Sequence, residues 1–278
     1  MKAGKIFACT LALMMVLSLS ACGKGTDSGA AVKPIELTVF AAASMEETLT
    51  ELGEKYMAAH EDVTVIFNFD SSGTLKTQIQ EGAEADIFIS AGQKQMNQLD
   101  SAADPAVNTE GLDFILMESR FNILENKVAL AVPEGNPANI RSYEDLVVGV
   151  TDGTILLAVG NSDVPVGQYT QKILAYFDLS EEALTAAGCV TYGSNVKEVT
   201  TQISEAAVDC GIIYQTDAYS ANLTVVDTAT AEMCGQVIYP AAVLKTSQNI
   251  EAAQEFLDYL TSDEADAVFE KVGFTPVA

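Results

Sequence analysis

IELTVFAAASMEETLTELGEKYMAAH, residues 35–60, contains the pattern that decides the fold. An alternating apolar segment leads into three alanines and Ser44, and a longer segment with helical periodicity follows. Apolar residues recur there at i, i+4, i+7 and i+11, namely at Met45, Leu49, Leu52 and Tyr56. The stretch predicts a strand over 37–40 and a helix over 45–60. Ser is a preferred N-cap and Glu47 completes a capping-box spacing, so Ser44 is expected to cap the helix.

Strands and helices alternate along most of the chain, which indicates an α/β protein with mainly parallel sheets covered by helices. Further strands are predicted at 63–69, 87–90, 127–132, 155–159, 211–214, 223–226 and 237–244. Helices are predicted at 74–81, 93–101, 142–146, 167–177, 181–187, 196–207, 249–261 and 263–272. Residues 102–125 read as irregular. Gly82 is expected just after a helix end, and Pro240 suggests an edge strand or a break.

The first residues read as an export signal and not as part of the fold. A short basic start precedes an apolar run over 6–20, which is too short for a comfortable membrane span. The run ends in Leu19-Ser-Ala-Cys22, which resembles a bacterial lipobox and implies a lipid on Cys22. An ordinary secretory signal with a chance cysteine is the alternative. We expect a signal peptide over 1–21 and a lipidated, flexible tether over 22–34.

The charge of the chain argues against some classes of partner. The formal net charge is −25, and removal of a signal that carries Lys2 and Lys5 and no acids leaves −27. This acidity argues against nucleic acid and against electrostatic binding to anionic lipid. A lone histidine, His60, and no CxxC spacing make a zinc site unexpected. Cys189, Cys210 and Cys234 allow at most one disulfide.

The junction at Ser44 is repeated in other strand-to-helix connections. Small or hydroxyl residues also open helices after 69–73, 160–167 and 192–195. Such loops lie at the carboxyl ends of parallel strands, and helix N-termini there present unpaired N–H groups and a positive dipole end. Each loop alone is compatible with ordinary capping, but together they favour an anion site. Because the loops contain no Lys or Arg, they suit a fully deprotonated oxyanion, provided that Asp70 points away.

Six segments resemble the molybdate-binding proteins of bacterial ABC importers, in the order of that family over nearly all of 35–278. They are 37–44 (LTVFAAAS), 69–75 (FDSSGTL), 78–91 (QIQEGAEADIFISA), 164–169 (VPVGQY), 211–218 (GIIYQTDA) and 272–274 (VGF). The resemblance implies a type II periplasmic-binding-protein fold, with lobe 1 over 35–122 and 219–278 and lobe 2 over 123–218. Residues 101–122 fit the family poorly, and the turn Gly160-Asn-Ser162 departs from its usual Gly-Asp-Pro.

The resemblance also implies a ligand and its donors. Molybdate or tungstate is expected between the lobes, without a cofactor or a bare metal ion. The implied donors are the hydroxyl and N–H groups of Ser44 and Ser72, the N–H groups of Val166 and Val196, and the phenol of Tyr214. Family members often have Ala in place of Val166, which matters little for a backbone donor. Asp217 is given no ligand role.

The resemblance implies an exported, monomeric, lipid-anchored protein that delivers its ligand to a membrane permease and is not an enzyme. No G-x-S-x-G elbow, P-loop or second histidine supports an enzyme. A binding protein for another tetrahedral oxyanion, sulfate above all, and a surface lipoprotein without a small ligand remain the alternatives.

Overall fold

The computed structural model describes residues 34–278, and residues 33–278 form one compact unit. The predicted signal peptide, Cys22 and almost all of the predicted tether lie outside the described residues. Within 34–278, no helix has the length and apolarity needed to cross a membrane.

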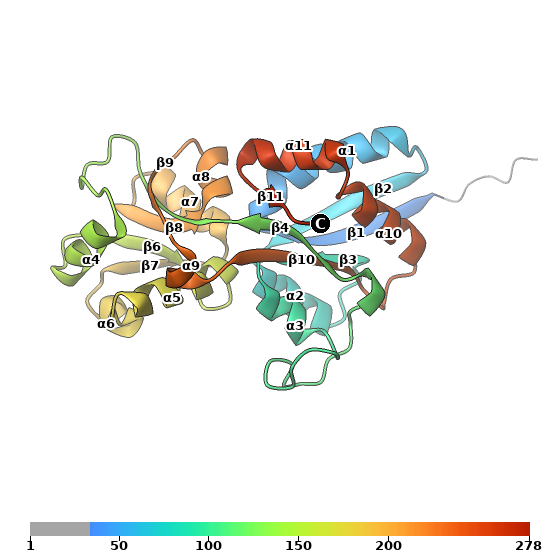
Figure 1. Cartoon of the computed structure of the whole chain (residues 1–278), viewed down its shortest axis with the longest axis horizontal. Helices are drawn as coiled ribbons and strands as arrows, with labels where there is room; N and C mark the ends of the chain where they lie inside the picture. The colour runs from blue at the N-terminus through green and yellow to red at the C-terminus, as the bar shows by residue number, and fades with distance from the viewer. Residues whose placement is uncertain (1–33) are drawn as a thin grey trace, which may run out of the picture. The chain divides into compact units, whose positions relative to one another are not determined.

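The first lobe is built on a six-stranded sheet of order β11-β4-β10-β3-β1-β2 (Figure 1). Its strands are β1 (Ile35–Ala42), β2 (Val63–Asp70), β3 (Ile87–Ile89), β4 (Phe121–Asn126), β10 (Val237–Val243) and β11 (Thr275–Pro276). Its helices are α1 (Glu46–Ala59), α2 (Ser72–Gln80), α3 (Gln93–Gln98), α10 (Ile250–Tyr259) and α11 (Asp263–Val272), with 3₁₀ turns η1 (Ala43–Met45) and η2 (Met117–Ser119).

The second lobe is built on a five-stranded sheet of order β7-β6-β8-β5-β9. Its strands are β5 (Val128–Val132), β6 (Leu157–Gly160), β7 (Val190–Gly193), β8 (Cys210–Tyr214) and β9 (Thr224–Thr228). Its helices are α4 (Tyr143–Thr151), α5 (Pro165–Tyr176), α6 (Glu181–Ala186), α7 (Val196–Ser204), α8 (Gln215–Ser220) and α9 (Ala231–Cys234). In α7 the buried residues are spaced at helical intervals, and they are Val196, Val199, Thr200 and Ile203.

The predicted α/β fold with two sheets is confirmed, but the sheets are mixed and not mainly parallel. β1 pairs in parallel with β2 and β3, and β6 pairs in parallel with β7 and β8. The strands β4, β5 and β10 pair only antiparallel. They belong to the segments that pass between the two sheets, so their direction follows from the path of the chain and not from a strand–helix–strand crossover.

Sheet membership also moves the lobe boundaries. β4 pairs within the first sheet and β9 within the second, so the chain passes between the lobes near 127 and again near 236. The sequence-based boundaries at 122/123 and 218/219 differ from these positions. We therefore use lobe 1 for residues 34–126 and 237–278, and lobe 2 for residues 127–236.

The strand β4 was not predicted, because residues 121–125 were expected to be irregular. This strand has little apolar alternation and is held by pairing with β10 and β11, which are distant in sequence. Pro240 is not on an edge strand. It lies in the interior strand β10, and pairing with β4 continues across it with a shift of register, because Tyr239 pairs with Leu124 and Pro240 with Asn122. Gly82 follows α2 with φ +93°, as expected.

Candidate functional site

Four connections bring the candidate site together at the carboxyl ends of parallel strands. The β1–α1 and β2–α2 connections come from lobe 1, and the β6–α5 and β7–α7 connections come from lobe 2. They border a small cavity. It is lined by Ala42, Ala43, Ser44, Asp70, Ser71, Ser72, Ala91, Val164, Pro165, Val196 and Tyr214. Among the described residues, no Lys, Arg or His lines this cavity.

Ser44 lies in the 3₁₀ turn η1 and not at the N-cap of α1, so the predicted capping box is wrong. The N-cap residue is Met45, and no side chain within the described part of the chain caps this helix. In this turn the Ser44 Oγ lies 2.8 Å from the hydroxyl of Tyr239, which also belongs to lobe 1. Ser44 is 5% exposed. Because of this extra turn, the Ser44 hydroxyl does not cap α1, and Ser44 lines the cavity.

Two neighbouring serines have different hydrogen-bond partners at the start of α2. Ser71 is the N-cap, and its Oγ accepts from the Thr74 N–H at 3.1 Å. Ser72 is thereby free of a capping role, and its Oγ accepts from the Ala91 N–H at 2.9 Å. Because that bond occupies a lone pair of Ser72, its hydroxyl proton remains available to a ligand in the cavity.

Lobe 2 contributes two helix N-termini. Asn195 caps α7 by accepting from the Glu198 N–H at 3.1 Å, and Val196 follows as the first helical residue. α5 begins at Pro165, which has no N–H, so Val166 carries the first N–H of that helix. Val166 lies one residue beyond the lining residues Val164 and Pro165. The first N–H groups of a helix have no partner within the helix, so both ends offer donors.

Tyr214 ends β8 and reaches from lobe 2 to lobe 1. Its hydroxyl donates to the Ala91 carbonyl at 3.5 Å, a long and weak bond. Burial raises the pKa of Tyr214 well above 10, so the phenol keeps its proton and acts as a donor. The structure thus brings four of the five predicted donor residues into the lining, namely Ser44, Ser72, Val196 and Tyr214, with Val166 adjacent.

Asp70 differs from its expectation, because it belongs to the lining of the cavity instead of pointing away. Its Oδ1 accepts from the Ser71 N–H at 2.7 Å and from the Asn195 amide at 3.5 Å. These two donors and the N-terminal end of α2 partly offset its negative charge. The contact with Asn195 also joins lobe 1 to lobe 2.

Two further contacts join the lobes around the cavity. The Lys197 Nζ of α7 lies 2.6 Å from the Glu47 Oε1 of α1 and 3.5 Å from the buried Asp217 Oδ1 of α8. Gly73 packs against the backbone of Asp163 so closely that a Cβ on Gly73 would lie 2.2 Å from the Asp163 carbonyl oxygen. The lobes are therefore in tight contact beside the cavity.

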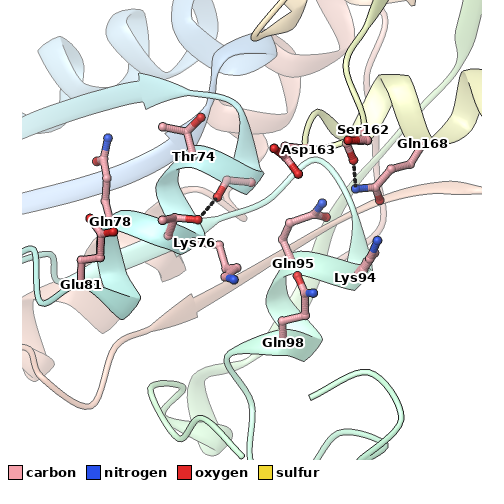
Figure 2. A pocket seen from close by; sticks show the side chains of 12 residues that line it. Thr74, Lys76, Gln78, Glu81, Lys94, Gln95, Gln98, Ser162, Asp163 and Gln168 are labelled. Carbon is pink, nitrogen blue, oxygen red and sulfur yellow. Dashed lines mark hydrogen bonds between the residues drawn. The ribbon is translucent and has the colours of Figure 1, made fainter. Parts of the chain in front are cut away.

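A larger, open cleft lies next to this contact, as Figure 2 shows. It measures about 900 Å³ and is lined by residues of α2, α3 and the β6–α5 connection, with Lys76, Lys94 and Glu81 among them. Gln168 is held there by a bond from its amide to the Ser162 carbonyl. Because this cleft contains none of the predicted donors and mixes both signs of charge, we assign ligand binding to the small cavity.

A metal centre has no candidate within the described residues. No group of three or more His, Cys, Asp or Glu side chains of residues 34–278 is placed to hold an ion. Cys189, Cys210 and Cys234 are free and buried. His60 stacks on Tyr56 with ring centroids 4.1 Å apart.

Sequence reasoning missed Tyr239, Asn126 and Ala91, which hold the predicted donors in place. Asn126 ends β4, and Tyr239 of β10 lies beside the shift of register between β10 and β4. The only sequence signal for these residues was Pro240, which was predicted to interrupt its strand and which directly follows Tyr239.

Known solute-binding proteins are similar to this chain. Residues 37–275 match the family described as bacterial extracellular solute-binding protein. A Bacillus subtilis protein, named provisionally as an ABC transporter substrate-binding lipoprotein, is 31% identical over 95% of each chain. The molybdate-binding protein of Haemophilus influenzae is 32% identical over 91% of this chain and 94% of its own.

A solved structure and a more distant relative are also similar to this chain. The periplasmic molybdate-binding protein of Azotobacter vinelandii superposes with a TM-score of 0.72 over 87% of this chain and all of its own, at 21% identity. This similarity shows the fold. A sulfate-binding protein of Synechococcus elongatus is 23% identical over 96% of this chain and 81% of its own.

Proposed function

Because this chain belongs to the bacterial extracellular solute-binding protein family, we propose that it captures molybdate or tungstate for an ABC importer. The observation that carries the proposal is the small cavity, whose donors are hydroxyl and backbone N–H groups without formal charge. A fully deprotonated oxyanion has only acceptors, so these donors suit it. The Oδ1 of Asp70, which also lines the cavity, already accepts from the Ser71 N–H and the Asn195 amide. The relatives that are named for molybdate support the same ligand.

Each proposed donor has a stated part in binding. Ser44 and Ser72 donate from lobe 1 through their hydroxyl and N–H groups. The Val166 and Val196 N–H groups and the Tyr214 phenol donate from lobe 2. Lobe 2 donors reach the ligand only when the lobes meet, so binding stabilises the closed arrangement. No chemical step is assigned, and the closed form presents the ligand to a permease.

The proposed setting is the outer face of a cell membrane. The signal and the lipobox that ends at Cys22 support export and a lipid anchor. The lipoprotein name of the Bacillus subtilis relative supports the same setting. An anchored monomer would stay close to its permease.

Sulfate is the second candidate ligand, and the similarity to a sulfate-binding protein favours it. Sulfate is also a tetrahedral dianion with acceptors only, so the same donors would serve. The two ligands differ mainly in size. The cavity is far smaller than the open clefts elsewhere on the molecule, which favours a small ligand of either kind over an amino acid or a sugar.

Calorimetric titration of residues 33–278 tests the proposed function. Molybdate and tungstate are each expected to bind one to one, while sulfate and phosphate give no heat. Binding of sulfate in place of molybdate would assign the protein to sulfur uptake. No heat from any of the four anions would refute the oxyanion site.

Ser72→Ala is expected to weaken molybdate binding without unfolding the protein. Loss of one hydrogen bond to a charged group costs about 1.5–3 kcal/mol, which corresponds to about tenfold or more in the dissociation constant. The measurement is the same titration, with thermal unfolding as a check of folding.

Ser142→Ala is the matched control for Ser72→Ala. Ser142 caps α4 by accepting from the Asp145 N–H, and it lies outside the cavity lining. This change should lower the melting temperature and leave molybdate affinity unaltered. Equal affinity of Ser72→Ala and the unmodified protein would remove Ser72 from the site.

A further inference from the structure

A buried chain of hydrogen bonds connects the segment between the lobes to Ser44. Asn126 ends β4, where the chain passes from lobe 1 to lobe 2. Its Oδ1 accepts from the Lys127 N–H at 2.8 Å, and this bond fixes the orientation of the side-chain amide. The Asn126 Nδ2 is therefore the donor toward its other neighbours.

The Asn126 amide sets the direction of the next bond. Its Nδ2 donates to the Thr216 Oγ1 at 2.9 Å and to the Tyr239 Oη at 3.2 Å. The Tyr239 Oη thus already accepts one bond. Within residues 34–278 its only other hydrogen-bond partner is the Ser44 Oγ at 2.8 Å.

Burial decides where the Tyr239 proton goes. Tyr239 is 0%, Asn126 3% and Ser44 5% exposed, so a hydroxyl proton without an acceptor would carry a large desolvation cost. The amide nitrogen of Asn126 cannot accept, so the Tyr239 proton points to the Ser44 Oγ. Burial also raises the pKa of Tyr239 well above 10, so this proton stays in place.

We propose that Tyr239, oriented by Asn126, is a positioning residue that makes Ser44 a hydrogen-bond donor toward the cavity. Because one of its two lone pairs accepts from Tyr239, Ser44 keeps its own proton for a ligand. This inference rests on the proposed oxyanion function and adds how its Ser44 donor is oriented.

A double-mutant cycle with Tyr239→Phe and Ser44→Ala tests the proposal by calorimetric titration with molybdate. Tyr239→Phe keeps the ring, and Asn126 keeps its bond to Thr216, so the protein should fold. We expect Tyr239→Phe alone to weaken molybdate binding by about tenfold. In the Ser44→Ala background the same change should have almost no effect, because its action passes through Ser44.

The cycle also separates this role from a merely structural one, because a structural loss would be equal in both backgrounds. Tyr143→Phe is the matched control, since Tyr143 is buried and its hydroxyl has no partner among residues 34–278.

The outcomes separate this proposal from the proposed function. Unchanged molybdate affinity in Tyr239→Phe, or equal losses in both backgrounds of the cycle, would overturn the role of Tyr239 while molybdate binding by the unmodified protein stands. Absence of molybdate binding by the unmodified protein would overturn the proposed function and this inference with it.

Discussion

Gly73→Ala is expected to weaken molybdate binding by on the order of a hundredfold or more, because the closed lobes leave no room for one methyl group. The added Cβ would lie 2.2 Å from the Asp163 carbonyl oxygen and 3.0 Å from the carbonyl carbon. Backbone atoms of a different lobe cannot rotate away as a side chain tip can. Separation of the lobes would remove the lobe 2 donors, each of which contributes about 1.5–3 kcal/mol.

The folded state of lobe 1 should tolerate this change. Gly73 lies in the first turn of α2, where Ala has a higher helix propensity than Gly. The unliganded melting temperature should therefore stay the same or rise, while the shift caused by molybdate becomes small. Calorimetric titration and thermal unfolding together measure both effects.

Gly92→Ala is the matched control for Gly73→Ala. It also adds a methyl group toward the other lobe, but that group would lie 3.5 Å from the Pro165 Cβ, an ordinary contact distance. Its affinity should remain close to that of the unmodified protein. If Gly73→Ala binds molybdate as tightly as Gly92→Ala does, then the lobe contact seen in the structure is not needed for binding.

The fold was predictable where local sequence patterns agree with the final packing. The alternation in residues 35–42 and the helical spacing of α1 each report a buried face, and β1 and α1 are both buried on that face. β4 was not predictable in this way. Its pattern is weak and its stability comes from partners more than a hundred residues away in β10 and β11.

The positions of the proposed donors Ser44 and Ser72 were predictable because small and hydroxyl residues at a strand-to-helix junction are visible in one local window of sequence. Val166, Val196 and Tyr214 were predicted as donors only from the family resemblance. The residues that orient those donors were not predictable, because each belongs to a segment distant from its partner. Tyr239, for example, meets Ser44 across 195 residues of sequence.

The protein is expected to lose stability as the pH rises from about 4 to about 7, and Asp217→Asn is expected to abolish this pH dependence. Asp217 is 1% exposed, and neither carboxylate oxygen accepts a hydrogen bond from residues 34–278. Burial raises the pKa of Asp217 to about 7, against the opposing effect of Lys197. Although burial lowers the pKa of Lys197, Asp217 and Glu47 raise it overall, so the lysine stays charged.

The sign follows from proton binding in the two states. Below about pH 4 the carboxyl is protonated in both, so it has no effect on stability. Between about pH 4 and 7 the unfolded chain is ionised and the folded chain keeps the proton, so the free energy of unfolding falls by about 1.4 kcal/mol per pH unit. Above about pH 7 the full cost of about 4 kcal/mol is present.

Urea unfolding between pH 4 and pH 8 measures this difference. Asn matches the protonated Asp in size but does not ionise, so Asp217→Asn should resemble the unmodified protein near pH 4 and be several kcal/mol more stable at pH 8. Asp152→Asn, at an exposed helix end, serves as the control and should run parallel to the unmodified protein. Parallel curves for Asp217→Asn as well would mean that Lys197, 3.5 Å away, compensates the charge of Asp217 fully despite burial.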